Sequence, residues 1–392
     1  MTLPTHWRDL LALMSASTVA GMTLSFVIPL LSLVMEQAGH PDWLIGLNAA
    51  TAGLSAFIIA PLLPRLVPVF GLRTLMISGM LLSAVMIMAF PQTDHIGLWF
   101  VIRFFAGVGM VVPFVLGEAA INALADEDSR GRIMGVYGTL FCVGFAFGPA
   151  LISLLGTETS LPFYTAAGLL VIASTPILLA KKADIGFERP SDLSFAAVYA
   201  LAPLAFVSIM VFGVMETAAF VLLPLYGLWL GLDSGGAAFL LSALIAGNIV
   251  LQYPLGWLGD RFGRPKLLLI CLAAGALCAF IMPLTTHALW LVLLMLVAFG
   301  GALGGMYTLT LSVIGMRFRG GDLAKASALF VLSYEAGAIF GPAALGTATS
   351  LTGMGALPVW LGGLLIVALI VGFRIEAQPA LPIAAALKRG SP

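Results

Sequence analysis

The chain has 392 residues, of which 61% are apolar and only 9% charged, with 18 basic and 18 acidic side chains. Soluble globular domains carry about 25% charged residues. This composition therefore excludes a soluble enzyme and a nucleic-acid-binding protein, and it predicts an all-α membrane protein.

Apolar runs of membrane-spanning length follow one another along the whole chain. A spanning helix needs roughly 20 apolar residues, because the hydrocarbon core of a bilayer is about 30 Å thick. Breaking the sequence at its polar and Gly/Pro clusters predicts twelve transmembrane helices. They cover 9–35, 43–63, 74–91, 97–121, 132–155, 161–180, 197–229, 236–257, 267–285, 288–315, 324–349 and 353–373.

The basic residues predict the orientation of these spans. If the N-terminus is cytoplasmic, every one of the 18 basic residues except Arg103 falls at the cytoplasmic side, and Arg103 lies inside a span. Lys and Arg favour the cytoplasmic loops of membrane proteins. We therefore expect a multi-pass protein with both termini in the cytoplasm.

An internal repeat divides the chain. Shifting the sequence by about 192 residues aligns glycine and Gly-Pro positions of the two halves. The aligned pairs are Gly71 with Gly263, Gly109 with Gly301, and, one residue further on, Gly148-Pro149 with Gly341-Pro342. This repeat predicts a six-helix bundle over 1–180, a cytoplasmic central loop over 181–196, a second six-helix bundle over 197–374 and a cytoplasmic tail over 375–392. Parallel halves of this kind are typical of transporters.

Two motifs carry a resemblance to a known family. Residues 256–264 read GWLGDRFGR, which matches in full the GxxxDRxGR loop signature of the major facilitator superfamily. Arg103 with Gly107 and Gly109 is similar to the RxxxGxG signature of that family's fourth span. The resemblance extends over essentially the whole chain. It implies two pseudo-symmetric six-helix bundles and secondary transport by alternating access.

Two further patterns narrow the resemblance. The segment 135–149 holds Gly-x8-Gly-x3-Gly-Pro, the front of a fifth-span signature that is associated with proton-driven exporters. The closing glycines of that signature are Ile and Ser here, at 152–153. Residues 117–119 (Gly-Glu-Ala) together with 252–256 (Gln-Tyr-Pro-Leu-Gly) are similar to the YcaD-like branch of the superfamily.

The GxxxDRxGR loop predicts a gate at the cytoplasmic side. Asp260 can bind the N-terminal end of a neighbouring helix or a basic side chain and so hold the gate closed. The alternative is a loop whose basic residues only keep it in the cytoplasm. In the first half, Pro68 and Val69 stand where Asp260 and Arg261 do, so we expect the gate to be held mainly from the second half. The candidate gating residues are Gly256, Asp260, Arg261, Gly263 and Arg264.

Glycines and prolines at helical spacing predict close helix packing. Gly144 and Gly148 in the fifth span, like the glycines of the tenth span, recur four residues apart, which lets helix backbones approach. Pro149 and Pro342 (next to Gly341) predict kinks at matching points. A second interpretation is that the fifth span packs against the second half and seals the route against ion leak.

Four ionisable residues of the predicted spans lie within the hydrocarbon zone: Arg103, Glu118, Glu216 and Glu335. Each costs roughly 2.5–3.5 kcal/mol to insert, so such residues usually face a cavity or a partner. Glu335 and Glu216 are the best candidates for binding a proton or a substrate cation. Glu118 serves the same path or pairs with a basic residue at 130 or 132. Arg103 holds a substrate anion, tunes a proton site or bonds carbonyls near a kink.

Uncharged polar side chains inside the spans are candidates for a cavity wall. They are Asn48, Tyr137, Asn248, Gln252, Tyr253, Tyr307 and Tyr334. Each of them is also suited to a hydrogen bond between helices, which is the commoner role of such residues.

These features predict a function without enzymatic activity. The sequence holds no nucleotide-binding or hydrolase motif, and its four His residues are too scattered for a metal site, so we expect no cofactor and no metal. The main hypothesis is a proton-coupled antiporter that exports a small amphipathic or cationic compound; the alternative is a proton-coupled symporter that imports a small metabolite. The expected partners are the substrate, protons and the lipid bilayer, with no nucleic acid. We expect a monomer in a bacterial cytoplasmic (inner) membrane.

Overall fold

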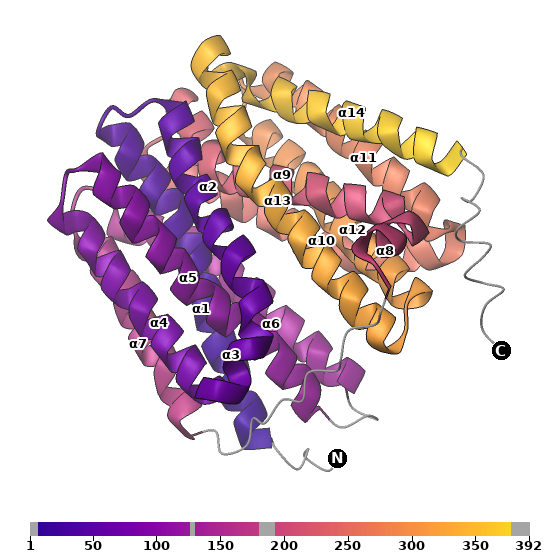
Figure 1. The fold of residues 1–392 in the computed structure, drawn as a ribbon. Helices are drawn as coiled ribbons and strands as arrows, with labels where there is room; N and C mark the ends of the chain where they lie inside the picture. Colours follow the sequence, from indigo (N-terminus) through magenta and orange to yellow (C-terminus); the bar gives the residue numbers. More distant parts are fainter. Residues whose placement is uncertain (1–6, 126–129, 180–192, 378–392) are drawn as a thin grey trace, which may run out of the picture. The chain divides into compact units, whose positions relative to one another are not determined.

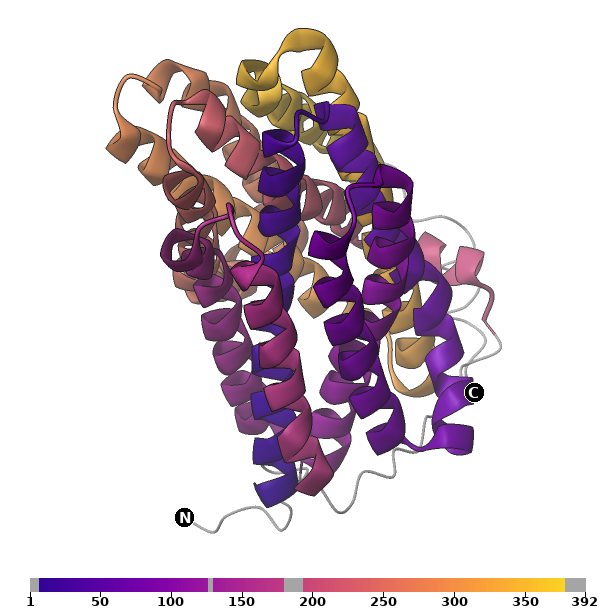
Figure 2. The same cartoon turned by 90° about the vertical axis from the view of Figure 1, so that its left-hand side faces the viewer.

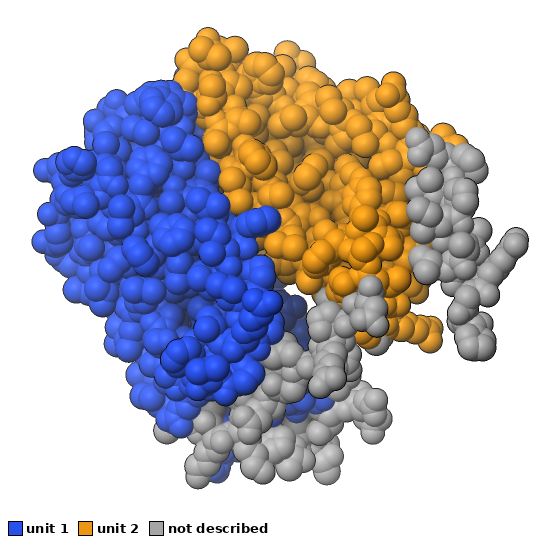
Figure 3. All heavy atoms as spheres, in the orientation of Figure 1, with its two compact units in different colours: residues 1–187, 220–242 blue, residues 188–219, 243–392 orange. Residues whose placement is uncertain are grey.

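The computed structural model describes residues 7–125, 130–179 and 193–377 (Figure 1). The chain forms two compact units, which Figure 3 shows in blue and orange. Unit 1 comprises Met1–Phe187 and Phe220–Ser242, and unit 2 comprises Glu188–Ala219 and Ala243–Pro392. The predicted central loop 181–196 and tail 375–392 fall mostly outside the described residues, and the predicted six-plus-six division stays a prediction.

Every element in the described part of the chain is a helix, and short 3-10 turns are labelled η. The elements are α1 (Trp7–Gln37), α2 (Asp42–Ile59), η1 (Ala60–Leu62), α3 (Leu63–Phe70), α4 (Leu72–Ala89), η2 (Phe90–Gln92), α5 (Ile96–Leu124), α6 (Arg130–Leu155), α7 (Leu161–Leu179), α8 (Phe195–Leu201), α9 (Pro203–Trp229), α10 (Ser234–Phe262), α11 (Arg264–Ile281), η3 (Met282–Thr285), α12 (Leu289–Arg317), α13 (Gly320–Thr352), η4 (Met354–Ala356) and α14 (Leu357–Ala377). Among the described residues, twelve helical segments are long and apolar enough to cross a membrane. The predicted all-α fold with twelve spans is confirmed.

The seventh span begins later than its apolar pattern indicates. The predicted span 197–229 is divided into α8 and α9, because Ala202 leaves the helical region with φ −143° and ψ 52°. Pro203, which follows it, has no N–H group to continue the hydrogen bonds of α8, and it suits the first position of a new helix. Ser194 caps α8 by accepting a hydrogen bond from the Ala197 N–H at 3.2 Å.

Four turn glycines repeat the internal period of the sequence. Gly71 (φ +76°) and Gly263 (φ +91°) end α3 and α10 and lie 192 residues apart. Gly39 (φ +78°) and Gly231 (φ +84°), in the turns after α1 and α9, are separated by the same 192 residues. Residues that have a Cβ atom rarely adopt a positive φ angle of this size. A glycine with a positive φ angle therefore follows corresponding helices in both halves of the chain.

In unit 1 the helices pack closely around α1. Helix α1 contacts α5, α6 and α7, while α4 contacts α5 and α7 (Figure 2). The two fifth-span glycines face α1: a Cβ atom at Gly144 would lie 2.7 Å from the Thr18 carbonyl oxygen, and one at Gly148 would lie 2.6 Å from that of Met22. Their small size is what allows α6 to approach the α1 backbone.

A group of uncharged polar side chains, here called the Gln37 cluster, joins the end of α1 to the start of α10 within unit 1. The Gln37 amide donates to the Thr157 hydroxyl at 2.7 Å and to the Ser234 hydroxyl at 3.0 Å. Beside it, the Ser153 hydroxyl donates to the Gly235 carbonyl at 2.9 Å. These bonds connect the turn after α6 and the first turn of α10 to α1.

In unit 2, α11 packs against α12 and α14, and α8 contacts α13. Helices α10 and α12 approach through glycines. A Cβ atom at Gly247 would meet the Val297 backbone, and one at Gly300 would meet the Leu244 backbone. Gly304, on the same side of α12, faces Asn248. Gly300 of the tenth span thus lies where two helix backbones approach each other.

Candidate functional site

Glycines bring α9 and α13 into direct contact in unit 2. Gly337 faces the Met210 carbonyl oxygen, and a Cβ atom at Gly337 would lie 2.8 Å from the backbone nitrogen of Val214. One turn along α13, a Cβ atom at Gly341 would lie 2.7 Å from the Val214 carbonyl oxygen. Since side chains three and four residues apart share a helix face, this contact places Tyr334 at the same interface.

The contact brings together three of the residues that we predicted for the transport path. The Tyr334 hydroxyl donates a hydrogen bond of 2.7 Å to Oε2 of Glu216. Glu335 follows Tyr334 in α13, and its charge is near enough to interact with that of Glu216. All three side chains are partly buried. The structure therefore pairs an acid of the seventh span with a tyrosine and an acid of the eleventh.

A series of aromatic rings extends from Tyr334, the tyrosine that binds Glu216. The Phe212 ring lies 5.3 Å from the Tyr307 ring and 6.1 Å from the Tyr334 ring, measured between centroids. Tyr307 and Phe330 meet edge to face at 5.7 Å. We call Phe212, Glu216, Tyr307, Phe330, Tyr334 and Glu335 the acidic aromatic cluster.

Two members of the cluster, Phe212 and Phe330, were not among the sequence candidates. A signal for them exists, because Phe212 lies four residues before Glu216, and Phe330 four before Tyr334. Residues at this spacing share a helix face. Carboxylates together with aromatic faces are groups that attract organic cations.

The remaining polar candidates of unit 2 have other contacts or an exposed position. Gln252 donates to the Thr308 hydroxyl at 3.1 Å and so links α10 to α12. Asn248 packs against Gly304 on the same pair of helices. Tyr253 is 83% exposed. Gln252 and Asn248 thus both make contacts between α10 and α12.

In unit 1 the predicted ionisable residues lie on α5. Arg103 is only 5% exposed, and its Nε atom has no hydrogen-bond partner within the described residues. Glu118 is exposed and near enough to the buried Tyr137 of α6 to interact with it electrostatically. The alternative partners of Glu118, the side chains of Arg130 and Arg132, lie outside the described residues.

A column of aromatic rings runs along α6 from Tyr137. The Tyr137 and Phe141 centroids are 6.1 Å apart, and those of Phe141 and Phe145 are 5.7 Å apart. Phe145 continues to Phe220 at 5.0 Å, within unit 1. The four-residue spacing of the first three rings is visible in the sequence, although we did not predict the column.

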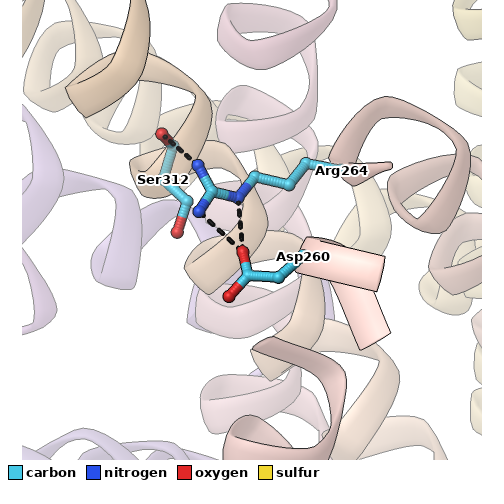
Figure 4. A network of polar contacts seen from close by, with 3 residues as sticks. All are labelled: Asp260, Arg264 and Ser312. Atoms are coloured by element: carbon cyan, nitrogen blue, oxygen red, sulfur yellow. Dashed lines mark hydrogen bonds and ion pairs between the residues drawn. The ribbon is translucent and has the colours of Figure 1, made fainter. Parts of the chain in front are cut away.

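The GxxxDRxGR segment is helical up to Phe262 rather than a loop. Asp260 pairs with Arg264, not with its neighbour Arg261: the Arg264 guanidinium reaches Asp260 Oδ1 at 2.7 and 3.2 Å and the Ser312 carbonyl at 3.3 Å (Figure 4). The Arg261 guanidinium lies 5.6 Å from the centre of the Trp257 ring. Arg264 thus ties the end of α10 and the start of α11 to α12.

Replacing Asp260 with Asn separates the two interpretations of this segment. The Asp260 side chain is 66% exposed, and exposed ion pairs contribute about 0–1 kcal/mol. We expect the thermal unfolding midpoint of the variant to change little. A gating role predicts a clear loss of transport rate in reconstituted vesicles. An unchanged rate, with Arg264→Gln also unchanged, would leave only the loop-retention interpretation.

No metal site is evident in the part of the chain that the structure describes. There, no group of three or more His, Cys, Asp or Glu side chains is arranged to hold a metal ion. The acidic aromatic cluster contains two carboxyl groups and two tyrosine hydroxyls, which are groups that can bind protons and organic cations.

Comparisons with known proteins give the family. A family model described as "Major Facilitator Superfamily" matches residues 13–235 and 204–390. "Uncharacterized MFS-type transporter YfkF" of Bacillus subtilis (strain 168) is 27% identical over 347 residues, covering 87% of this chain and 88% of the relative. "Uncharacterized MFS-type transporter YcaD" of Salmonella arizonae is 24% identical and covers 86% and 88%.

Solved structures show the same fold at low sequence identity. The crystal structure of the nucleoside transporter NupG superposes with a TM-score of 0.77 and 15% identity, over 95% of this chain and all of that one. A bacterial homologue of the human lysosomal transporter Spinster, in an inward-facing and unoccupied conformation, gives 0.80 and 13%, over 96% and 98%. The predicted resemblance is confirmed: the chain belongs to the major facilitator superfamily, and it is a multi-pass secondary transporter.

Proposed function

We propose that this protein is a proton-coupled antiporter that exports a small amphipathic or cationic organic compound. The acidic aromatic cluster is the observation that carries the proposal. We further propose that it works as a monomer in a bacterial cytoplasmic membrane with both termini in the cytoplasm, an orientation supported by the distribution of its basic residues. The six spans of each half would form the two moving bundles.

The two acids of the cluster supply a proton site. Two charged carboxylates close together in a membrane repel each other and are costly to hold. Glu216 and Glu335 therefore favour carrying a proton when no other cation is present. The Tyr334 hydroxyl, donating to Glu216 at 2.7 Å, holds one acceptor oxygen in a defined direction.

An organic cation competes with that proton. Its positive charge balances the carboxylates, and the faces of Phe212, Tyr307 and Phe330 attract it through cation–π interactions and apolar contact. The cluster then binds either the substrate or the proton, but not both. Exclusive binding of two ligands at one site is the condition for exchange across the membrane.

Vesicles that contain the purified protein, with an imposed pH gradient, test the proposal. The probe is an aromatic quaternary ammonium, because it has no neutral form that crosses the bilayer passively. Antiport predicts accumulation when the vesicle interior is acidic, relative to protein-free vesicles. Uptake of a small metabolite driven by an acidic exterior would instead support the alternative, proton-coupled import. Equal movement with and without the gradient would reject proton coupling.

A further inference from the structure

A buried cation in unit 1 has no balancing charge among the described residues. Arg103 is 5% exposed, and no carboxylate of the residues that the structure describes forms an ion pair with it. Its Nε donor has no partner in the described chain. An arginine taken out of water without a counter-charge or full hydrogen bonding is costly. The Arg103 guanidinium therefore needs a hydrogen-bond acceptor for its Nε donor, and residues 7–125, 130–179 and 193–377 do not supply one.

A second unpartnered donor belongs to Asn48 of α2. This residue is 2% exposed, and its Nδ2 atom has no hydrogen-bond partner among the residues described. Asn48 is the seventh residue of α2, and Arg103 is the eighth residue of α5. Both donors thus lie about 10 Å from the starts of their helices.

Helix packing places the two donors at the same level. The chain reverses at Gly71 and again between η2 and α5, so α2 and α5 run in the same direction and contact each other. A Cβ atom at Gly107 of α5 would lie 3.2 Å from Cα of Ala52 of α2. One turn earlier in each helix stand Arg103 and Asn48. Their unpartnered nitrogens therefore occupy corresponding turns of adjacent helices.

We propose that Arg103 and Asn48 form a binding site for an oxyanion, such as the carboxylate of a small solute or the phosphate of an anionic lipid. A planar guanidinium matches the paired oxygens of such groups, and charge-assisted hydrogen bonds to it are the strong ones. The Asn48 amide adds a neutral donor beside the charge. The site does not depend on the proposed proton coupling, since it lies in unit 1 and uses none of the acidic aromatic cluster.

Thermal unfolding of the purified full-length protein in a neutral detergent tests the site. The protein is titrated with benzoate, with inorganic phosphate or with phosphatidylglycerol, at an ionic strength kept constant with sodium chloride. We expect the unfolding midpoint of the unsubstituted protein to rise with an oxyanion, because a ligand that binds only the folded state stabilises it. A response to benzoate or phosphate identifies a solute site, and a response to phosphatidylglycerol alone identifies a lipid site.

Three variants make the test specific. Arg103→Gln should weaken the apparent affinity by roughly ten- to a hundredfold, which is what a lost charged hydrogen bond costs. Asn48→Asp supplies a carboxylate next to Arg103, so its midpoint should be higher without oxyanion and should no longer respond to one. Arg73→Gln is the control, because Arg73 is exposed and donates to the Leu178 carbonyl; it should keep the full response.

Two results would overturn the site. One is an unsubstituted protein whose midpoint does not respond to any of the three oxyanions. The other is a response that persists in both Arg103→Gln and Asn48→Asp. Because the measurement uses no membrane and no pH gradient, these results leave the proposed antiport untouched, and failure of antiport in vesicles leaves the oxyanion site untouched.

Discussion

Glu216→Gln is expected to reduce gradient-driven accumulation in reconstituted vesicles to the level of protein-free vesicles. Glutamine keeps the size of the side chain and a carbonyl oxygen that can accept the bond that Tyr334 now donates to Glu216 at 2.7 Å. It cannot take up or release a proton. The same loss is expected for Glu335→Gln, whereas binding of the probe should remain measurable in both variants.

Tyr334→Phe is the matched control for these two variants. It keeps the aromatic ring near Phe212 and removes only the hydroxyl donor. A hydrogen bond to a charged group contributes about 1.5–3 kcal/mol, so we expect a reduced rate while coupling persists. Full gradient-driven transport in both Glu216→Gln and Glu335→Gln would refute the assignment of the proton to this pair.

Gly337→Ala is expected to destabilise the protein by about 1–3 kcal/mol, the usual cost of overpacking. The added methyl group would press on the Met210 carbonyl and on the Val214 nitrogen, which are backbone atoms and cannot turn away as a side chain can. The fraction of the variant that still folds should also transport more slowly, because separating α9 from α13 moves Glu216 away from the Tyr334 hydroxyl. Resistance to unfolding by detergent measures the first effect.

Gly363→Ala is the control for this substitution. Gly363 lies in α14, and nothing lies within 4 Å of a Cβ atom built there. Alanine favours a helix over glycine by about 1 kcal/mol, so this variant should be as stable as the original protein or more so. Equal stability of Gly337→Ala and Gly363→Ala would show that α9 and α13 do not approach as closely at Gly337 as described.

The length of the spans was predictable because the bilayer imposes it, but local breaks and extensions were not. The run 197–229 is apolar throughout, so its hydropathy gave no sign that Ala202 leaves the helix. Pro203 was the one available signal, because the residue before a proline is disfavoured in the helical region. Conversely, the charges at 260–261 indicated a loop, although α10 continues to Phe262. Extending that helix by one turn would have predicted the pair of Asp260 with Arg264, since residues four apart are neighbours on a helix surface.

The candidate site was predictable as a set of residues and not as an arrangement. Buried acids stand out in an apolar sequence, which is why Glu216 and Glu335 were found. The residues that lie next to these acids depend on how α9 and α13 are rotated and how closely they approach. Glycines such as Gly337 and Gly341 decide this, because they allow the two backbones to meet. The sequence shows those glycines but not the backbone that each of them faces.

The two ends of α10 respond differently to the surrounding solution. At its first residue, the Ser234 hydroxyl accepts from the Gln37 amide at 3.0 Å, a contact between groups without charge. At its last turn, Asp260 is held by an exposed ionic contact to Arg264. Added salt screens the attraction between opposite charges, with a screening length of about 8 Å at physiological ionic strength. Ionic conditions therefore loosen one end of this helix and leave the other end as it was.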